Sequence, residues 1–368
     1  MTNNIYIGAM SGTSLDGIDA VLVSFDGDKP HIIDHLSMAL PENIRGEAFD
    51  LIADDKDGIN RLYRLANNIS LTYAQCINRL LSNNKGCKVI AAGCHGQTIR
   101  HFPNDPLAFT IQCINGAGLA LAIKTPTVVD FRSADIWAGG QGAPLAPGFH
   151  AKLFRKASSS RVILNLGGIA NITYLPSNET EPVIGFDTGT ASSLMDYWIN
   201  ANSGSQFDSD GTWASSGTVN KTLLELLCND DYFRLLPPKS TGREYFSPHW
   251  LQEKLRGFKD IKSQNVQATL LEFSATTIVK AINLYCPETQ EIYACGGGTK
   301  NSALMSRIST LLESKTFCST ESLGLDPQLV EACAFAWLAM RRVNQQTGNL
   351  PDVTGAKREV VLGALYQP

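Results

Sequence analysis

The sequence lacks the two most common nucleotide-binding signatures. Its 368 residues contain no G-x-x-x-x-G-K-[ST] motif, and no G-x-G-x-x-G motif follows a strand-like run. These absences argue against the P-loop and Rossmann modes of phosphate binding. A chain of this kind that uses ATP has to hold the phosphates in other backbone turns.

Long apolar runs and blocks of like charge are also absent. No segment approaches the roughly 18 apolar residues that a membrane-spanning helix requires. The 31 basic and 35 acidic residues are mixed along the chain and give a formal net charge of -4. The sequence therefore predicts neither a membrane partner nor a nucleic-acid partner.

Paired cysteines and a leader-like N-terminal segment are missing as well. None of the nine cysteines sits in a C-x-x-C pair, and no basic segment followed by an apolar stretch opens the sequence. We expect reduced, mostly buried thiols in a cytoplasmic protein. With 43% hydrophobic and 18% charged residues, the chain has the composition of a globular protein long enough for two domains.

Two glycine-bearing hairpins are predicted about 155 residues apart. In the first, apolar residues 5–10 and 18–25 flank the turn Ser11 to Gly17. In the second, residues 161–166 and 169–175 flank Gly167 and Gly168. Their similar plan suggests a duplicated domain.

Helices and strands alternate in both halves of the chain. Helical periodicity covers residues 59–81 and 266–285, and each of these runs precedes a short apolar strand. A third helix is expected to begin with Asp326 as the N-cap and Pro327 at the first helical position. This alternation predicts an α/β fold with mixed sheets. We expect a hinge near residues 131–134, which gives one lobe of residues 1–131 plus about 345–368 and a second lobe of residues 132–344.

The first turn has the composition of an anion-binding site. Gly12, Thr13, Ser14, Asp16 and Gly17 give it backbone N–H groups and hydroxyls that can converge on a phosphate, and Asp16 can reach a phosphate-bound cation. The alternative is an ordinary surface hairpin.

Asp187 is the candidate general base. It follows the apolar run 184–186 and is expected at the carboxyl end of a strand, where open α/β sheets build their sites. Capping of a turn is the alternative role. The turn Gly296-Gly297-Gly298 lets a flat base or ribose approach the backbone, or simply connects a strand to a helix.

Several polar residues are candidates for binding a sugar. His95 and Gln97 follow a buried strand, and Asp130 and Arg132 alternate along an extended segment. A structural histidine and a structural salt bridge are the commoner uses of such residues. Glu331 lies in the first turn of the third helix, where an acid is favoured for electrostatic reasons alone.

Seven short motifs in one order resemble those of the anhydro-N-acetylmuramic acid kinases, and the match runs almost from end to end. The motifs are Met10 to Asp19, His95-Gly96-Gln97-Thr98, Asp130-Phe131-Arg132, Gly139 to Pro144, Asn165 to Asn171, Phe186-Asp187-Thr188-Gly189 and Thr241-Gly242-Arg243-Glu244. The family belongs to the sugar kinase, actin and heat-shock chaperone ATPase superfamily. The resemblance implies two duplicated ribonuclease H-like lobes with an ATP cleft between them.

The resemblance also implies the reaction. ATP and water convert 1,6-anhydro-N-acetylmuramic acid into N-acetylmuramic acid 6-phosphate and ADP, in peptidoglycan recycling. Asp187 would activate the water, Mg²⁺ would assist the phosphoryl transfer, and residues His95, Asp130, Arg132 and Glu331 would bind the amino sugar. The nucleotide contacts would come from Gly12, Thr13, Ser14, Leu15, Asp16, Gly17, Ile18, Asp19, Gly167, Gly168, Gly296, Gly297 and Gly298, with Asp16 also at the metal.

One motif departs from the family pattern, and other functions stay open. The family loop Asp-Thr-Gly-Pro-Gly-Asn is replaced by Asp187-Thr188-Gly189-Thr190-Ala191-Ser192, which leaves the path of the loop open. One alternative is a conventional kinase acting on a reducing amino sugar. Another is an ATP-driven scaffold or chaperone, which the lack of a separate peptide-binding domain disfavours. Homodimer formation is left open.

Overall fold

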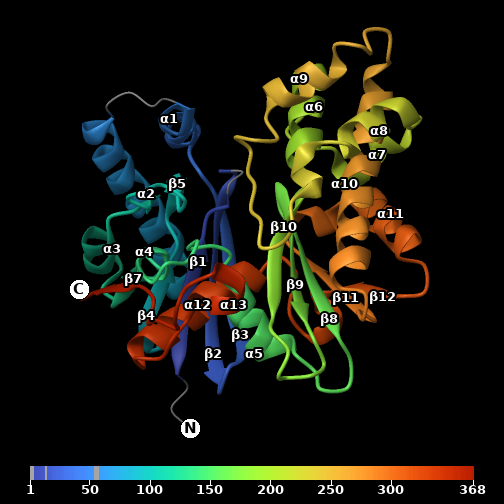
Figure 1. The fold of residues 1–368 in the computed structure, drawn as a ribbon. Helices are drawn as coiled ribbons and strands as arrows, with labels where there is room; N and C mark the ends of the chain where they lie inside the picture. The colour runs from blue at the N-terminus through green and yellow to red at the C-terminus, as the bar shows by residue number, and fades with distance from the viewer. Residues whose placement is uncertain (1–3, 13–14, 54–57) are drawn as a thin grey trace. The chain divides into compact units, whose positions relative to one another are not determined.

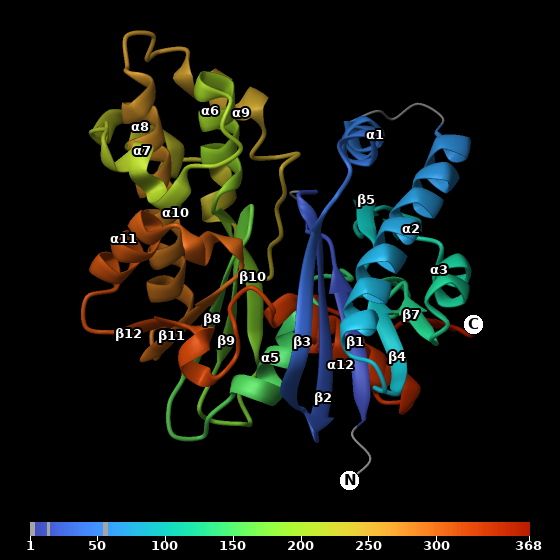
Figure 2. The ribbon, with the colours of Figure 1, turned by 180° about the vertical axis from the view of Figure 1, so that it is seen from behind.

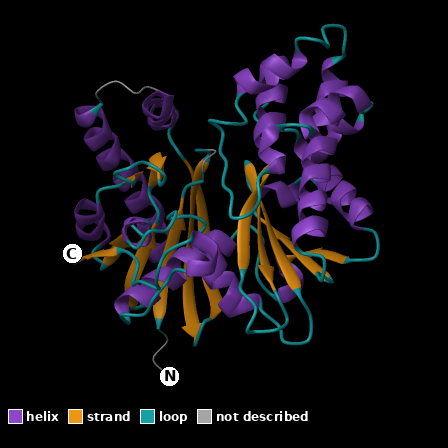
Figure 3. Cartoon of the chain, in the orientation of Figure 1, coloured by secondary structure: helices purple, strands orange, loops and turns teal. Residues whose placement is uncertain are grey.

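The computed structural model describes residues 4–12, 15–53 and 58–368. Contacts divide the chain into two compact units. Unit 1 comprises Met1–Leu153 and Leu329–Pro368, and unit 2 comprises Phe154–Gln328. Figures 1 and 2 show the chain from two opposite sides, and Figure 3 shows that both units combine strands with helices.

The sheet of unit 1 has six strands among the described residues, in the order β13-β7-β4-β1-β2-β3. A separate pair, β5 and β6, forms a hairpin. The strands are β1 (Ile5–Met10), β2 (Gly17–Asp26), β3 (Lys29–Ala39), β4 (Val89–Cys94), β5 (Gln97–Phe102), β6 (Phe109–Cys113), β7 (Thr127–Val129) and β13 (Ala364–Tyr366). The helices are α1 (Glu42–Ala53), α2 (Ile59–Asn83), α3 (Gly116–Ile123), α4 (Ser133–Trp137), α5 (Ala146–Phe154), α12 (Val330–Val343) and α13 (Pro351–Thr354).

The alternation of side chains along β1 separates the two helical layers of unit 1. Ile5, Ile7 and Ala9 are buried in the core that includes the apolar face of α2. On the other side, Gly8 faces α12, and a Cβ added at Gly8 would overlap the carbonyl oxygen of Ala332. The same relation holds between Gly93 of β4 and the backbone of α12. Glycine therefore lets α12 lie directly on the centre of the sheet.

This packing explains where the division between the units falls. The sequence assigned residues 132–153 and 329–344 to the second lobe. In the structure α12 packs against β1, β2 and β4 and belongs to unit 1. The helix also begins later than expected, at Val330, because the Asp326 carboxylate accepts a hydrogen bond from the N–H of Gln328 in a turn that precedes the helix. The prediction of Asp326 as N-cap and Pro327 as first helical residue was wrong.

The sheet of unit 2 has five strands in the described chain, in the order β10-β9-β8-β11-β12. They are β8 (Arg161–Leu166), β9 (Ile169–Leu175), β10 (Ile184–Thr190), β11 (Glu291–Cys295) and β12 (Thr316–Ser319). The helices are α6 (Ser193–Ser203), α7 (Thr212–Ser215), α8 (Lys221–Cys228), α9 (Pro248–Leu255), α10 (Ser263–Tyr285) and α11 (Ser302–Leu312), with 3₁₀ turns at Ser209–Gly211, Asp231–Arg234, Gly297–Lys300 and Thr320–Leu323.

The two sheets share one topology. In each unit the first three strands form an antiparallel meander, and the next two strands continue the sheet parallel to the first strand and beyond it. A long helix, α2 or α10, joins the third strand to the fourth, and a shorter helix, α3 or α11, joins the fourth to the fifth. The expected duplication of a ribonuclease H-like α/β lobe with a mixed sheet is confirmed. None of the described helices combines the length and the apolar character needed to cross a bilayer.

Candidate active site

The turn between β1 and β2 starts at a buried serine. The hydroxyl of Ser11 donates a hydrogen bond to Oε1 of Gln97 at 3.0 Å, and both side chains are buried. Beyond it, Leu15 adopts a left-handed conformation with φ of 56°, and its N–H bonds to the carbonyl of Gly12 at 3.1 Å. The turn is therefore fixed at both ends, by a side chain from β5 and by its own backbone.

The expected phosphate-binding stretch Gly12 to Asp19 is described only in part, because Thr13 and Ser14 lie outside the described residues. Asp16 is exposed beside the turn. The carboxylate of Asp19 accepts a 2.5 Å hydrogen bond from Ser37 across the β2–β3 ladder. Asp19 is thus engaged within the sheet, whereas Asp16 is the accessible carboxylate of this pair.

His95 and Arg132, which the sequence proposed separately, are in direct contact. Nε and Nη2 of Arg132 lie 3.1 Å and 2.8 Å from Nε2 of His95. Because a guanidinium can only donate, Nε2 has to accept and the imidazole proton resides on Nδ1, which is 2.9 Å from the carbonyl of Gly96. Burial and the adjacent guanidinium hold the pKa of His95 well below its usual range. The ring is therefore a neutral acceptor that orients Arg132.

Arg132 keeps its charge near two carboxylates. Burial lowers its pKa to about 10, while Glu331 and Asp135 favour the charged form. Glu331, in the first turn of α12, thus belongs to the same electrostatic cluster. Asp130 plays a different part, because its carboxylate binds the hydroxyl and the N–H of Ser133 at the start of α4, at 2.6 Å and 3.3 Å. It does not pair with Arg132 in any hydrogen bond found among the described residues.

In unit 2, Asp187 lies within β10 rather than at its end. The strand continues to Thr190, and the register with β9 shifts between Asp187 and Gly189. The expectation of a strand-end position was wrong, because this bulge keeps the polar residues paired with β9 while it redirects the backbone. Gly189, with φ of 128°, supplies the conformation that the bulge requires.

The two carboxylate oxygens of Asp187 have different surroundings. Oδ2 accepts hydrogen bonds from the hydroxyl of Ser240 and from the N–H of Thr241, each at 2.9 Å. Oδ1 has no hydrogen-bond partner among the described residues. Burial raises the pKa of Asp187 to about 6, the bonds from Thr241 and Ser240 oppose the rise, and Glu244 adds to it. One oxygen is therefore held, and the other can accept a proton near neutral pH.

The backbone around Asp187 is fixed on both sides. Its N–H bonds to the carbonyl of Lys239 at 3.1 Å, and its carbonyl accepts the hydroxyl of Tyr232 at 2.6 Å. Segment 239–241 therefore lies beside β10 and contacts Asp187 through both backbone and side chain. After the bulge, Thr190 is buried with its hydroxyl 3.2 Å from that of Ser274 in α10. This contact defines the path of the loop that departs from the family pattern.

The second hairpin turn is tied to the start of α6. The carbonyl of Gly168 accepts the N–H groups of Ala191 and Ser193 at 3.0 Å and 3.1 Å, and that of Gly167 accepts Ser192 at 3.2 Å. A Cβ on Gly168 would be 3.2 Å from Nη2 of Arg243. The glycine turn, the helix and a guanidinium therefore converge at this point.

The glycine turn after β11 packs closely on the end of β8. A Cβ at Gly296 would collide with the side chain of Asn165, and one at Gly298 would collide with Leu166. Gly297 alone of the three faces open space within 4 Å. Two of these glycines are thus required by strand packing, and the backbone at Gly297 is the part of the turn that a ligand could approach.

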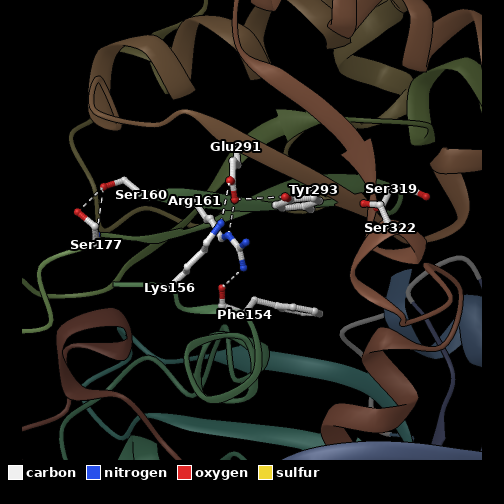
Figure 4. Close-up of polar contacts among 9 residues, drawn as sticks. All are labelled: Phe154, Lys156, Ser160, Arg161, Ser177, Glu291, Tyr293, Ser319 and Ser322. Atoms are coloured by element: carbon white, nitrogen blue, oxygen red, sulfur yellow. Dashed lines mark hydrogen bonds and ion pairs between the residues drawn. The ribbon is translucent and has the colours of Figure 1, made fainter. Parts of the chain in front are cut away.

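A separate polar cluster lies at the opposite ends of β8 and β11 (Figure 4). Nε of Arg161 binds Oε2 of Glu291 at 2.6 Å, Nζ of Lys156 lies 3.4 Å from Oε1, and the hydroxyl of Tyr293 donates to Oε2 at 3.2 Å. Arg161 also donates to the carbonyl of Phe154. These contacts join two neighbouring strands at their first residues, away from the turns at their carboxyl ends, and their role is structural.

The structure brings some predicted residues together and adds others. His95, Arg132 and Glu331 cluster in unit 1, and the turns at Gly167–Gly168 and Gly296–Gly298 lie at the carboxyl ends of the adjacent strands β8 and β11 of unit 2. Sequence reasoning missed Ser240, which precedes the polar motif Thr241 to Glu244, and Asp135. The only signals were that motif for Ser240 and the unusual glycine content of residues 139–142 for Asp135.

Comparisons with known proteins give consistent names. A family model described as anhydro-N-acetylmuramic acid kinase matches residues 4–368. Anhydro-N-acetylmuramic acid kinase of Shewanella pealeana is 46% identical over 368 residues, which cover 100% of this chain and 99% of that protein. The protein of the same name from Nitrosomonas europaea is 46% identical over 363 residues, 98% of this chain and 99% of its own.

Solved structures are more distant. The activator of the 2-hydroxyisocaproyl-CoA dehydratase from Clostridium difficile, with bound ADPNP, is 12% identical, covers 92% of this chain and 96% of its own, and has a TM-score of 0.46. A ROK family glucokinase from Streptomyces griseus, in complex with glucose and AMPPNP, is 13% identical, covers 92% and 99%, and has a TM-score of 0.39. The full-length family match and the identity to the named relatives decide the assignment: the chain belongs to the anhydro-N-acetylmuramic acid kinase family.

Proposed function

We propose that the protein opens 1,6-anhydro-N-acetylmuramic acid with water and transfers the γ-phosphoryl group of ATP to the 6-oxygen, giving N-acetylmuramic acid 6-phosphate and ADP in peptidoglycan recycling. Family membership supports the substrate and the reaction class. The observation that carries the mechanism is the asymmetric environment of the Asp187 carboxylate, which is suited to a general base.

Asp187 accepts the proton of the attacking water in this proposal. Ser240 and Thr241 bind Oδ2 and so fix the orientation of the carboxylate, and Oδ1 accepts the proton. With a pKa of about 6, the carboxylate is ionised at pH 7 yet more basic than an ordinary aspartate. The water oxygen bonds to the anomeric carbon while the bond from that carbon to the bridging 6-oxygen breaks. The 6-oxygen, carrying the released electron pair, attacks the γ-phosphorus, and ADP leaves.

Arg132, His95 and Glu331 orient the sugar in the same proposal. Arg132 has a planar set of donors that suits carboxylate and hydroxyl oxygens, such as those of a lactyl ether and a sugar ring. His95 fixes that plane by accepting two of its donors. Asp130 acts at one remove, because its carboxylate is already bound to Ser133 at the start of α4.

The nucleotide contacts in the proposal are the backbone turns at the carboxyl ends of strands. These are Gly12 to Asp19 in unit 1, and Gly167, Gly168 and Gly296 to Gly298 in unit 2. Mg²⁺ commonly takes one or two carboxylates together with substrate phosphates and waters. The described residues include no group of three or more metal-ligating side chains, and an exposed Asp16 fits that smaller requirement. When bound, Mg²⁺ would neutralise charge on the transferring phosphoryl group.

A screen of sugar acceptors tests the proposal. ATP-to-ADP conversion is measured with the anhydro sugar, with reducing amino sugars and with no acceptor. We expect conversion that depends on the 1,6-anhydro sugar, and ¹⁸O-water should place label on the anomeric carbon of the product at early times. Asp187→Asn should lose nearly all turnover and retain nucleotide binding.

Three other outcomes would contradict the proposal, and each would support a different function or mechanism. Phosphorylation of a reducing amino sugar without incorporation of label would replace the proposal with a conventional sugar kinase. ATP hydrolysis that no sugar stimulates, together with a stable protein partner, would indicate an ATP-driven scaffold. Normal turnover in Asp187→Asn would remove Asp187 from the mechanism.

A further inference from the structure

A fully buried carboxylate lies under the glycine-rich loop of unit 1. Asp135, in α4, has no exposed surface. Its Oδ1 accepts hydrogen bonds from Nδ2 of Asn349 and from the hydroxyl of Thr354, each at 2.7 Å, and its Oδ2 accepts the N–H of Gly142 at 2.8 Å. Both oxygens are thus engaged, and all three partners are donors. Such a site specifies a carboxylate, because an amide would set a donor against a donor on one side.

The glycine content of residues 139–142 follows from this contact. A Cβ at Gly140 would collide with the Asp135 carboxylate, and Gly142, with φ of 67°, would direct a Cβ to 2.8 Å from Ile136. The N–H of Gln141 bonds to the carbonyl of Thr354 at 2.7 Å. The loop therefore wraps closely over Asp135, held between α4 and the C-terminal segment of the chain.

Gly142 connects Asp135 to Arg132, the candidate for sugar binding. Gly142 gives its N–H to Asp135, and its carbonyl accepts Nη1 of Arg132 at 2.8 Å. His95 receives the other side of the guanidinium. Arg132 is therefore fixed at two points, and one of them depends on a peptide group whose position is set by Asp135.

We propose that Asp135 is a positioning residue for substrate binding: through Gly142 it sets the orientation of the Arg132 guanidinium toward the sugar. This inference rests on the proposed function for the role of Arg132, but the geometry from Asp135 to His95 does not. Asp135 touches no reacting atom, so its effect falls on binding of the sugar and on the state of the His95 ring.

The test compares two isosteric substitutions at buried carboxylates. Asp135→Asn places an amide where three donors converge. Asp208→Asn is the matched control, because Asp208 is also buried and accepts the N–H groups of Trp213 and Ala214 and the amide of Gln267, all within unit 2 and outside the proposed machinery. Thermal stability, the KM values for sugar and ATP, and the ¹⁵N resonances of the His95 ring are measured for each.

We expect both variants to lose stability and only Asp135→Asn to change Arg132. In that variant the KM for the anhydro sugar rises about tenfold, as expected for one weakened hydrogen bond to a charged group. The KM for ATP stays within about twofold, on the same scale. The His95 Nε2 resonance moves as the donation from Arg132 weakens.

The inference is overturned if Asp135→Asn loses stability like the control and keeps the sugar KM and the His95 resonance of the wild type. If Asp135→Asn does not fold, Thr354→Val removes a single donor and should still shift the resonance; an unmoved resonance there also overturns it. If the wild type does not use the anhydro sugar, the proposed function fails, and the His95 resonance still decides the role of Asp135.

Discussion

The hydroxyl of Ser240 offers a way to change the proton affinity of Asp187 without touching Asp187 itself. The hydroxyl donates to Oδ2 at 2.9 Å, and it stabilises the ionised form of the carboxylate. Ser240→Ala removes this bond and leaves the backbone donor of Thr241 in place. Ser240 is exposed, so the substitution creates no cavity.

The size of the effect follows from the strength of the bond. A hydrogen bond to a charged group contributes roughly 1.5–3 kcal/mol, and we take the lower end because water can replace an exposed hydroxyl. Since one pKa unit corresponds to about 1.4 kcal/mol, the pKa of Asp187 should rise by about one unit, from about 6 toward 7. A base works only when ionised, so the acid limb of the rate profile should move to higher pH. At pH 6 the ionised fraction should fall from about one half to about one tenth.

The assay is the pH dependence of kcat/KM for the anhydro sugar between pH 5 and 9. We expect Ser240→Ala to recover most of the wild-type rate above pH 8. The control is Ser322→Ala, which removes an exposed hydroxyl that bonds to the carbonyl of Ser319 (Figure 4) and should leave the profile unchanged. A uniform drop at every pH with an unmoved acid limb, or a limb moved to lower pH, would refute the reasoning.

Three further predictions concern stability. Because burial raises the pKa of Asp187 to about 6, the folded state binds more protons than the unfolded state between about pH 4 and 6, and stability falls as pH rises through that window. Asp187→Asn should therefore be more stable than wild type at pH 8, by up to about 3 kcal/mol, and equal to it near pH 4 in denaturant titrations. Gly8→Ala should lose about 2–4 kcal/mol by chemical denaturation, because its Cβ meets the backbone of α12; Gly46→Ala, an exposed position in the interior of α1 with open space around it, should gain up to about 1 kcal/mol, because alanine favours the helix. Glu291→Gln should lose about 1 kcal/mol at pH 7 with unchanged kcat; burial raises the pKa of Glu291, but Arg161, Tyr293 and Lys156 together lower it below its ordinary value, so the difference from wild type should shrink below about pH 4.

Much of the fold could be predicted from local patterns. The strands at 5–10 and 161–166 and the helix at 266–285 follow from apolar runs and helical periodicity, and the structure has them within a few residues of the expected bounds. Local patterns failed where a distant partner decided the outcome. The run after Phe186 looks like a turn, yet pairing with β9 across a bulge keeps it in the strand.

The contacts of the site were less predictable than its residues. His95 and Arg132 stand out by residue type and by position after strands, and Asp187 stands out as a carboxylate that follows an apolar run. Ser240 is 53 residues from Asp187, and Asn349 is 214 residues from Asp135, so neither contact leaves a periodic signal in the sequence. Such bonds depend on tertiary packing, which composition and spacing do not encode locally.

The shared topology of the two units has a consequence for how their sequences diverged. The residue that follows the fourth strand of the ladder is His95 in unit 1 and Gly296 in unit 2, and each comes directly after a cysteine, Cys94 or Cys295. In one copy the position carries an imidazole that holds an arginine; in the other, any side chain would strike the neighbouring strand. The same position of the shared topology thus meets two incompatible requirements, and exchanging the two residues should damage both halves of the protein.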